Sequence, residues 1–266
     1  YPNGNADVNH FHAAGGMGFV MRELLAAGLL DGSAMTVWGG SLNDYAVEPT
    51  LTTDGVIFRP APEASLDTTI LRPVADPHQA NGGLAMLAGN IGRAVIKVSA
   101  VDPAYHTITA PAAVFDHEAD VKAAIASGQL DHDVAVVVRN QGPQANGMPE
   151  LHSLTPMLSN LQDQGFSVML ITDGRMSGAS GRVPAAIHVT PEAVNGGAIG
   201  RIRDGDMITL DVGAGALSVD ADLDGRPACE ASSPEGGFGR ELFSDMRDQA
   251  ASAEAGGGIN LLRRYR

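Results

Sequence analysis

The chain has 266 residues, of which 44% are hydrophobic and 18% charged, so it can bury a sizeable core and does not have the composition of a disordered protein. Its net charge of −14 argues against nucleic acids and anionic membrane surfaces as partners. An anionic substrate would therefore need local positive charge or a metal ion. The single cysteine, Cys229, excludes an internal disulfide and any all-cysteine metal or iron–sulfur site built from this chain alone.

No apolar run is as long as a membrane span, and the first residues lack a signal-peptide pattern. These observations lead us to expect no membrane partner and a cytoplasmic protein.

The first 54 residues contain one helical pattern followed by a polar stretch. Phe19, Leu24 and Leu25 recur at helical spacing after two glycines, and residues 39–54 have the composition of a loop or linker. After this stretch the pattern changes to short strands separated by turns, which predicts a domain boundary near residues 54–55. His10 and His12 are two positions apart and do not share a helix face, so we expect a structural or solvated role for both.

From residue 55 onward the sequence is rich in short apolar runs that favour strands. The runs expected to form strands are 56–60, 70–73, 94–98 (which residues 82–87 lead into), 108–115, 207–212 and 217–219, with short helices at 120–125 and 240–246.

One segment predicts a strand–loop–helix–strand unit. The predicted strand 133–138 (DVAVVV) is followed by a polar loop, a helical stripe of leucines from Leu151 to Leu161, and a short apolar run at 167–171. Such a unit makes its two strands parallel, with a right-handed crossover. Glu150, at the start of the helix, and Ser177, just past the second strand, should then both lie beyond the carboxyl ends of parallel strands, where open α/β sheets bind ligands.

The loop after the second strand interleaves glycines with serines. Gly174, Gly178 and Gly181 alternate with Ser177 and Ser180, so the backbone can approach a ligand closely and direct N–H groups and hydroxyls at it. An ordinary Asp-Gly turn is the alternative, in which Asp173 only holds the turn through a side-chain hydrogen bond. His188 follows in a predicted strand, where a buried, hydrogen-bonded histidine is the expected role.

Several motifs resemble the dihydroxy-acid dehydratase and 6-phosphogluconate dehydratase family. They are the long stretch TDGRMSGASGRVPAAIHVTPEAVNGGAIGRIRDGD at 172–206, GMPE at 147–150, GGLAMLAGNIGRAVIKVSAV at 82–101 and VNHFHAAGGMGFVMRELLAAGLL at 8–30. Met176 and the Ala179-Ser180-Gly181 triplet are closer to the 6-phosphogluconate branch. The resemblance implies an α/β fold: a barrel-like, β-rich swivelling domain with flanking helices over residues 55–266, which carries the catalytic loop. Residues 1–54 would be the end of the N-terminal cluster-binding domain and a linker.

The resemblance also implies roles for four residues. Ser177 would be the catalytic base, Glu150 a ligand of Mg²⁺, and Arg175 and Ser180 substrate contacts. Each has a structural alternative: Glu150 could stabilise a helix N-terminus, and the loop side chains could make only local hydrogen bonds. An iron–sulfur cluster, expected to be 4Fe-4S, would take its ligands from a domain outside this chain.

The implied reaction is dehydration of 6-phospho-D-gluconate to 2-dehydro-3-deoxy-6-phospho-D-gluconate in the Entner–Doudoroff route, by a hydro-lyase expected to be a homodimer. This chain would be the C-terminal part of that enzyme and inactive without the missing N-terminal domain. The alternatives are another sugar-acid or dihydroxy-acid dehydratase, or a non-catalytic domain that binds anions through its glycine- and serine-rich loop.

Overall fold

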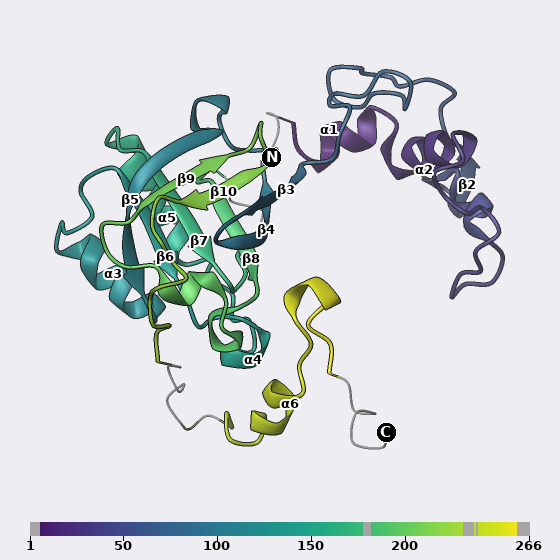
Figure 1. Cartoon of the computed structure of the whole chain (residues 1–266). Helices are drawn as coiled ribbons and strands as arrows, with labels where there is room; N and C mark the ends of the chain where they lie inside the picture. The colour runs from purple at the N-terminus through teal and green to yellow at the C-terminus, as the bar shows by residue number, and fades with distance from the viewer. Residues whose placement is uncertain (1–5, 178–181, 231–236, 238, 260–266) are drawn as a thin grey trace. The chain divides into compact units, whose positions relative to one another are not determined.

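The computed structural model describes residues 6–177, 182–230, 237 and 239–259 (Figure 1). Contacts divide the chain into two compact units, one up to Gly82 and one from Gly83 onward. The boundary predicted near residues 54–55 falls in the turn between two paired strands of the first unit, since Thr52 lies opposite Gly55. No described helix has the length and apolar character needed to cross a membrane.

The first unit consists of two helices and a β-hairpin. Its elements are α1 (Val8–Ala13), α2 (Gly16–Ala26), the 3-10 helix η1 (Leu42–Tyr45), β1 (Val47–Thr52) and β2 (Gly55–Pro60). Helix α2 confirms the predicted helical pattern, and its Phe19 is buried. The expectation that residues 39–54 form a loop is wrong, because η1 and β1 lie there and β1 pairs along its whole length with β2.

The second unit is a closed barrel. Eight of its described strands enclose it in the order β10-β3-β4-β8-β7-β6-β5-β9. Their bounds are β3 Leu84–Gly89, β4 Gly92–Lys97, β5 Thr107–Phe115, β6 Val134–Val138, β7 Val168–Thr172, β8 Ala185–Thr190, β9 Met207–Asp211 and β10 Ala216–Val219. The run β5-β6-β7-β8 is parallel, and the remaining strand pairs are antiparallel except for β10 with β3. This architecture confirms the expected barrel-like α/β class.

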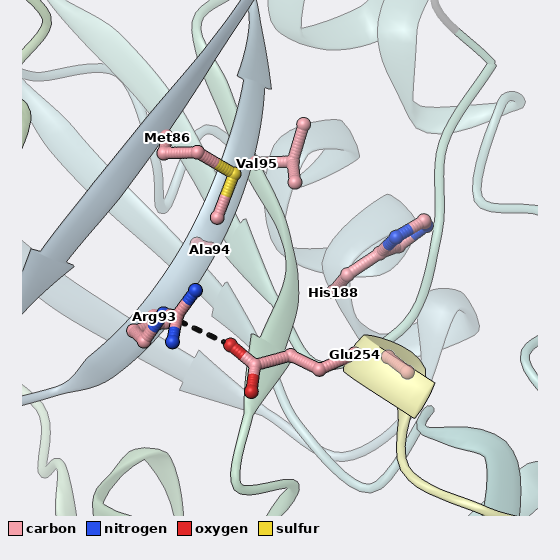
Figure 2. A pocket seen from close by; sticks show the side chains of 7 residues that line it. Met86, Arg93, Ala94, Val95, His188 and Glu254 are labelled. Carbon is pink, nitrogen blue, oxygen red and sulfur yellow. Dashed lines mark ion pairs between the residues drawn. The ribbon is translucent and has the colours of Figure 1, made fainter. Parts of the chain in front are cut away.

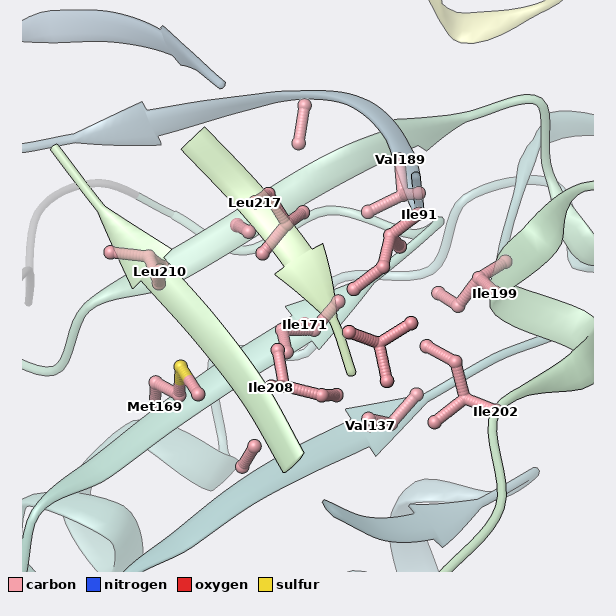
Figure 3. Close-up of a cluster of buried hydrophobic side chains, with 14 of the residues drawn as sticks. Ile91, Val137, Met169, Ile171, Val189, Ile199, Ile202, Ile208, Leu210 and Leu217 are labelled. Carbon is pink, nitrogen blue, oxygen red and sulfur yellow. The ribbon is translucent and has the colours of Figure 1, made fainter. Parts of the chain in front are cut away.

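The barrel is filled by side chains. Eight strands leave an interior just wide enough for side chains to pack, and Ile171, Ile208, Leu210 and Leu217 lie in it, all fully buried (Figure 3). Strand β6, Val-Ala-Val-Val-Val, contains no polar residue because both of its faces are buried. Its Ala135 and Val137 belong to the interior cluster, and its other valines to a second cluster outside the barrel.

Two helices cover the outside of the parallel strands. They are α3 (Glu118–Ala126) and α5 (Leu154–Asp163), which contact each other and supply Val121, Leu154 and Leu158 to the outer cluster. Because both faces of β6 and β7 are covered, these strands read as continuous apolar runs without alternation. The leucines of α5 recur at helical spacing because that face of the helix packs on the outside of these strands.

The predicted strand–loop–helix–strand unit is confirmed. β6 and β7 are parallel in register from Val134 opposite Val168 to Val138 opposite Thr172, and α5 connects them. The loop contains one short helix that the sequence pattern did not indicate, α4 (Pro143–Asn146). The remaining elements include η4 (Ala193–Asn195), η5 (Ala198–Arg201), α6 (Ser244–Asp248) and η6 (Ala253–Ala255). The last predicted helix, 240–246, is therefore displaced toward the C-terminus.

Candidate active site

The loops that follow β6 and β7 meet at one edge of the barrel. Glu150 and Arg175 form an isolated parallel bridge, and the Leu151 N–H donates to the Arg175 carbonyl at 3.0 Å. The sequence expectation that Glu150 and the loop of Ser177 share an edge is confirmed by this pairing. It follows from the parallel register of the two strands that precede the loops.

The Glu150 carboxylate accepts hydrogen bonds from two residues of the loop after β7, Arg175 and Ser177. One carboxylate oxygen accepts from the Ser177 backbone N–H at 2.5 Å, and the other accepts from the Arg175 guanidinium at 3.1 Å. Arg175 also donates from Nε to the Met148 carbonyl at 2.8 Å. The Glu150 side chain is one-third exposed, so its carboxylate remains within reach of a ligand from solvent. Ser180 lies outside the described residues.

The start of the loop needs glycine and a buried anchor. A Cβ on Gly174 would lie 2.6 Å from the Gln141 Cβ, so the two loops approach too closely for any larger residue. Two residues later, Met176 anchors the loop: its side chain is buried in the outer cluster, and its sulfur accepts a hydrogen bond from the Thr155 hydroxyl on α5. Ser177 thus follows a segment with a fixed path.

Asp173 has a larger role than the turn-holding hydrogen bond suggested by the sequence. The Thr172 hydroxyl holds the turn instead, by accepting from the Gly174 N–H at 2.9 Å. The fully buried Asp173 carboxylate accepts from the backbone N–H groups of Gln141 at 2.8 Å, Ala193 at 2.9 Å and Asn140 at 3.2 Å. Burial raises the pKa of Asp173, although these hydrogen bonds act in the opposite direction.

A second buried acid supports the same edge. Glu192 accepts from the backbone N–H groups of Gln144 and Ala145 at the start of α4, at 3.2 Å each. Burial raises the pKa of Glu192, and the negative charge of Asp173 adds to this effect. Sequence reasoning missed Glu192 as a support because its hydrogen bonds join residues 47–48 positions apart.

Strained backbone gathers at this edge. Among the described residues, the non-glycine positions with positive φ are Asn140 after β6, Met148 before Glu150, and His188 in β8. Such conformations cost free energy and cluster at functional sites. The His188 N–H donates to the Gly174 carbonyl at 2.9 Å, which ties β8 to the loop. Burial lowers the pKa of His188, as does the nearby charge of Arg175. His188 lies in a strand as predicted, but it is only partly buried.

The donor set determines which groups the site can hold. The described residues contain no cluster of three or more His, Cys, Asp or Glu side chains placed to bind a metal ion. Glu150 can supply one hard oxygen ligand, which fits Mg²⁺ only if further ligands come from elsewhere. The one cysteine, Cys229, lies against Asn140 and Gly200. The chain by itself does not fit an iron–sulfur cluster.

Comparison with known proteins finds relatives that match almost the whole chain. The family described as "Dihydroxy-acid/6-phosphogluconate dehydratase C-terminal" matches residues 69–257, and its N-terminal counterpart matches residues 1–45. The chain is 54% identical over 265 residues to a phosphogluconate dehydratase of Rhizobium meliloti and 52% identical over 261 residues to one of Pseudomonas aeruginosa. These alignments cover 97% and 96% of this chain but only 44% and 43% of the relatives.

A relative from the other branch of the family is more distant. A dihydroxy-acid dehydratase of Nitratidesulfovibrio vulgaris is 39% identical over 226 residues, which is 84% of this chain and 38% of that protein. The chain thus spans less than half the length of these relatives, and it corresponds to their C-terminal family match and a short part of their N-terminal one. By its sequence and the motifs that meet at the barrel edge, the chain belongs to the dihydroxy-acid/6-phosphogluconate dehydratase family.

Proposed function

We propose that the intact protein containing this chain dehydrates 6-phospho-D-gluconate to 2-dehydro-3-deoxy-6-phospho-D-gluconate, as in the Entner–Doudoroff route. The observation that carries the proposal is the pairing of Glu150 with the backbone of Ser177 at the carboxyl edge of the parallel strands. It is supported by relatives named phosphogluconate dehydratase at 45–54% identity, against 39% for the dihydroxy-acid dehydratase.

Ser177 is the proposed base. Its hydroxyl, as the alkoxide, takes the proton from C2 of the sugar acid, and the C3–O bond breaks. The departing hydroxide takes up the proton that Ser177 removed and leaves as water, so the alkoxide is regenerated. The resulting enol then tautomerises to the 2-keto-3-deoxy acid. A serine needs nearby positive charge to act as a base. Arg175, two residues before Ser177, supplies one positive charge within this chain, and Mg²⁺ bound at Glu150 would supply more.

Glu150 is the proposed Mg²⁺ ligand and Arg175 a substrate contact, together with Ser180. When bound, Mg²⁺ supplies Lewis-acid stabilisation for negative charge that develops on the substrate. The 2.5 Å hydrogen bond from the Ser177 backbone N–H to Glu150 supports this proposal, because it holds the residue that carries the base next to the metal ligand. The planar guanidinium of Arg175 can recognise a carboxylate with two parallel hydrogen bonds.

The rest of the assembly belongs to the same proposal. The C-terminal part, proposed over residues 55–266 and containing the barrel, would act as the swivelling domain of a homodimeric enzyme, and a 4Fe-4S cluster would be held by the N-terminal domain. The 266-residue chain alone would then be inactive, since it supplies the base and one metal ligand but no cluster ligands.

The test is Ser177→Ala in the intact enzyme. Loss of a general base lowers kcat by about 10²–10⁴-fold. The fold should persist, because alanine keeps the backbone N–H that donates to Glu150. Ser153→Ala, which removes an exposed hydroxyl at the start of α5, is the matched control. If both variants turn over 6-phosphogluconate at the wild-type rate, Ser177 is not the base and the non-catalytic anion-binding alternative is favoured.

Substrate class is tested separately. The intact wild-type enzyme should dehydrate 6-phosphogluconate with a higher kcat/KM than a non-phosphorylated 2,3-dihydroxy acid. The reverse order would assign the protein to the other branch of the family.

A further inference from the structure

A cavity of about 430 Å³ opens on the wall of the barrel, beside β8, the strand that follows the proposed catalytic loop. Its lining includes Met86 on β3, Arg93 and Val95 on β4, His188 on β8 and Glu254 on η6 (Figure 2). The site described above does not include Arg93 or Glu254.

Strand register places this cavity at the catalytic edge. β8 runs parallel to β7, with Ile171 opposite Ala186, so residues 188–190 extend beyond the end of β7. Arg93 lies opposite Thr190, at the start of the antiparallel strand β4. The His188 N–H reaches the Gly174 carbonyl at 2.9 Å. One lining residue of the cavity, His188, is therefore hydrogen-bonded to Gly174, where the loop that leads to Ser177 begins.

The cavity contains a cation, Arg93, that an anion can bind in exchange for the carboxylate of Glu254. Arg93 supplies its permanent positive charge, and its side chain is 63% exposed. The guanidinium Nε lies 3.0 Å from the Glu254 carboxylate, drawn as a dashed line in Figure 2. This contact shows that an oxyanion inside the cavity can reach Arg93. In a chain with a net charge of −14, each cation that an anionic substrate can reach lowers the electrostatic cost of binding it.

Glu254 belongs to a C-terminal segment that is attached to the site. The Gln144 side-chain amide on α4 donates to the Ala250 carbonyl at 2.7 Å, and the Ala251 N–H donates to the Gly258 carbonyl at 2.9 Å. These bonds place η6 against β8. The Glu254 carboxylate is thus positioned to compete with any other anion for Arg93.

We propose that Arg93 binds the terminal phosphate of the phosphorylated sugar acid in this cavity, in competition with Glu254, and so selects phosphorylated over non-phosphorylated substrates. The proposal rests on the proposed function, in which the carboxylate end of the same substrate lies toward Glu150 and Arg175. A guanidinium matches phosphate oxygens in a bidentate geometry and stays charged at every relevant pH.

The test measures ligand binding in the intact protein with Ser177→Ala as background, so that no turnover occurs. Isothermal titration gives Kd for 6-phosphogluconate and for D-gluconate, which lacks the phosphate. Adding Arg93→Ala should weaken 6-phosphogluconate binding by about 10- to 100-fold, the loss expected for one charge-assisted pair. Adding Glu254→Gln should tighten it, because the competing carboxylate is gone. D-gluconate binding should change little in either case.

The two variants are expected to change the affinity for 6-phosphogluconate in opposite directions, and this distinguishes a ligand-binding role of Arg93 from a purely structural ion pair. If the Arg93–Glu254 contact only stabilised the fold, both variants would lose the same pair and change affinity in the same direction, for both ligands. Lys122→Ala, which removes an exposed cation paired with Glu118 at 2.9 Å on α3, is the control for loss of one positive charge. Equal weakening by Lys122→Ala and Arg93→Ala would overturn the proposal, as would no effect of Arg93→Ala.

Failure of the proposed function has a different result. It would appear as absence of 6-phosphogluconate turnover by the wild-type enzyme, whatever the binding data. Turnover by the wild type with no dependence of 6-phosphogluconate affinity on Arg93 would refute only the phosphate subsite.

Discussion

The support of the catalytic edge by Asp173 gives a quantitative prediction. Asp173→Ala leaves three backbone N–H groups without their acceptor, on Asn140, Gln141 and Ala193, and all three residues are buried. Each unpaired buried donor costs about 1–3 kcal/mol. Water entering the vacated space pairs with some of these donors, and the cost of burying the carboxylate is removed. The expected net loss in free energy of unfolding is about 2–4 kcal/mol.

Asp173→Asn separates the hydrogen bonds from the charge. One Asp173 oxygen accepts from both Asn140 and Ala193, and the other accepts from Gln141. An asparagine oxygen can replace the first, but its amide NH₂ then faces the Gln141 N–H, donor against donor. The loss should therefore be smaller than for alanine, at about 1–2 kcal/mol.

Urea unfolding of the 266-residue chain at pH 8 measures both variants. Far-UV circular dichroism is the appropriate signal, because it reports directly on the strands of the barrel, whereas the one tryptophan, Trp38, belongs to the first unit. Asp163→Ala, which removes an exposed carboxylate paired with Arg182, is the control. A loss below about 1 kcal/mol for Asp173→Ala, or a larger loss for asparagine than for alanine, would refute the assignment of Asp173 as the acceptor that joins these loops.

Two further predictions concern the barrel. Because burial and Arg175 lower the pKa of His188 in the folded state, the unfolded chain takes up a proton first as the pH falls, and stability should decrease below about pH 6.5. His188→Asn, whose side chain tolerates the left-handed backbone, should reduce that decrease in urea unfolding at pH 7.5 and 5.5; an unchanged pH slope would contradict the assignment. A Cβ added at Gly89 would lie 1.9 Å from the Leu217 carbonyl oxygen, so Gly89→Ala should cost about 1–3 kcal/mol of unfolding free energy where β3 and β10 close the barrel. Gly82→Ala meets no atom within 4 Å and should cost much less in the same assay; equal losses would refute the steric explanation.

The sequence by itself determined the parallel core and the edge where the candidate site lies. The apolar runs of β6 and β7 have no polar interruption because both of their faces are covered, and the leucines of α5 recur at helical spacing because one face packs on them. These patterns are local, so they can be read along the chain. They are sufficient to place Glu150 and Ser177 together.

Only the tertiary structure decided which residues support and extend that edge. The Asp173 carboxylate accepts hydrogen bonds from residues both before and after it in the sequence. Glu192 accepts from the N-terminus of α4, 47–48 residues earlier in the chain. Arg93 forms an ion pair with Glu254, and most of the sequence of the second unit lies between them. Closure of the barrel also depends on residues far apart in the sequence, since Ala88 of β3 pairs with Ala216 of β10. Hydrogen bonds and ion pairs of this kind leave no periodic signal in the sequence, because their partners are brought together only when the strands close into a barrel.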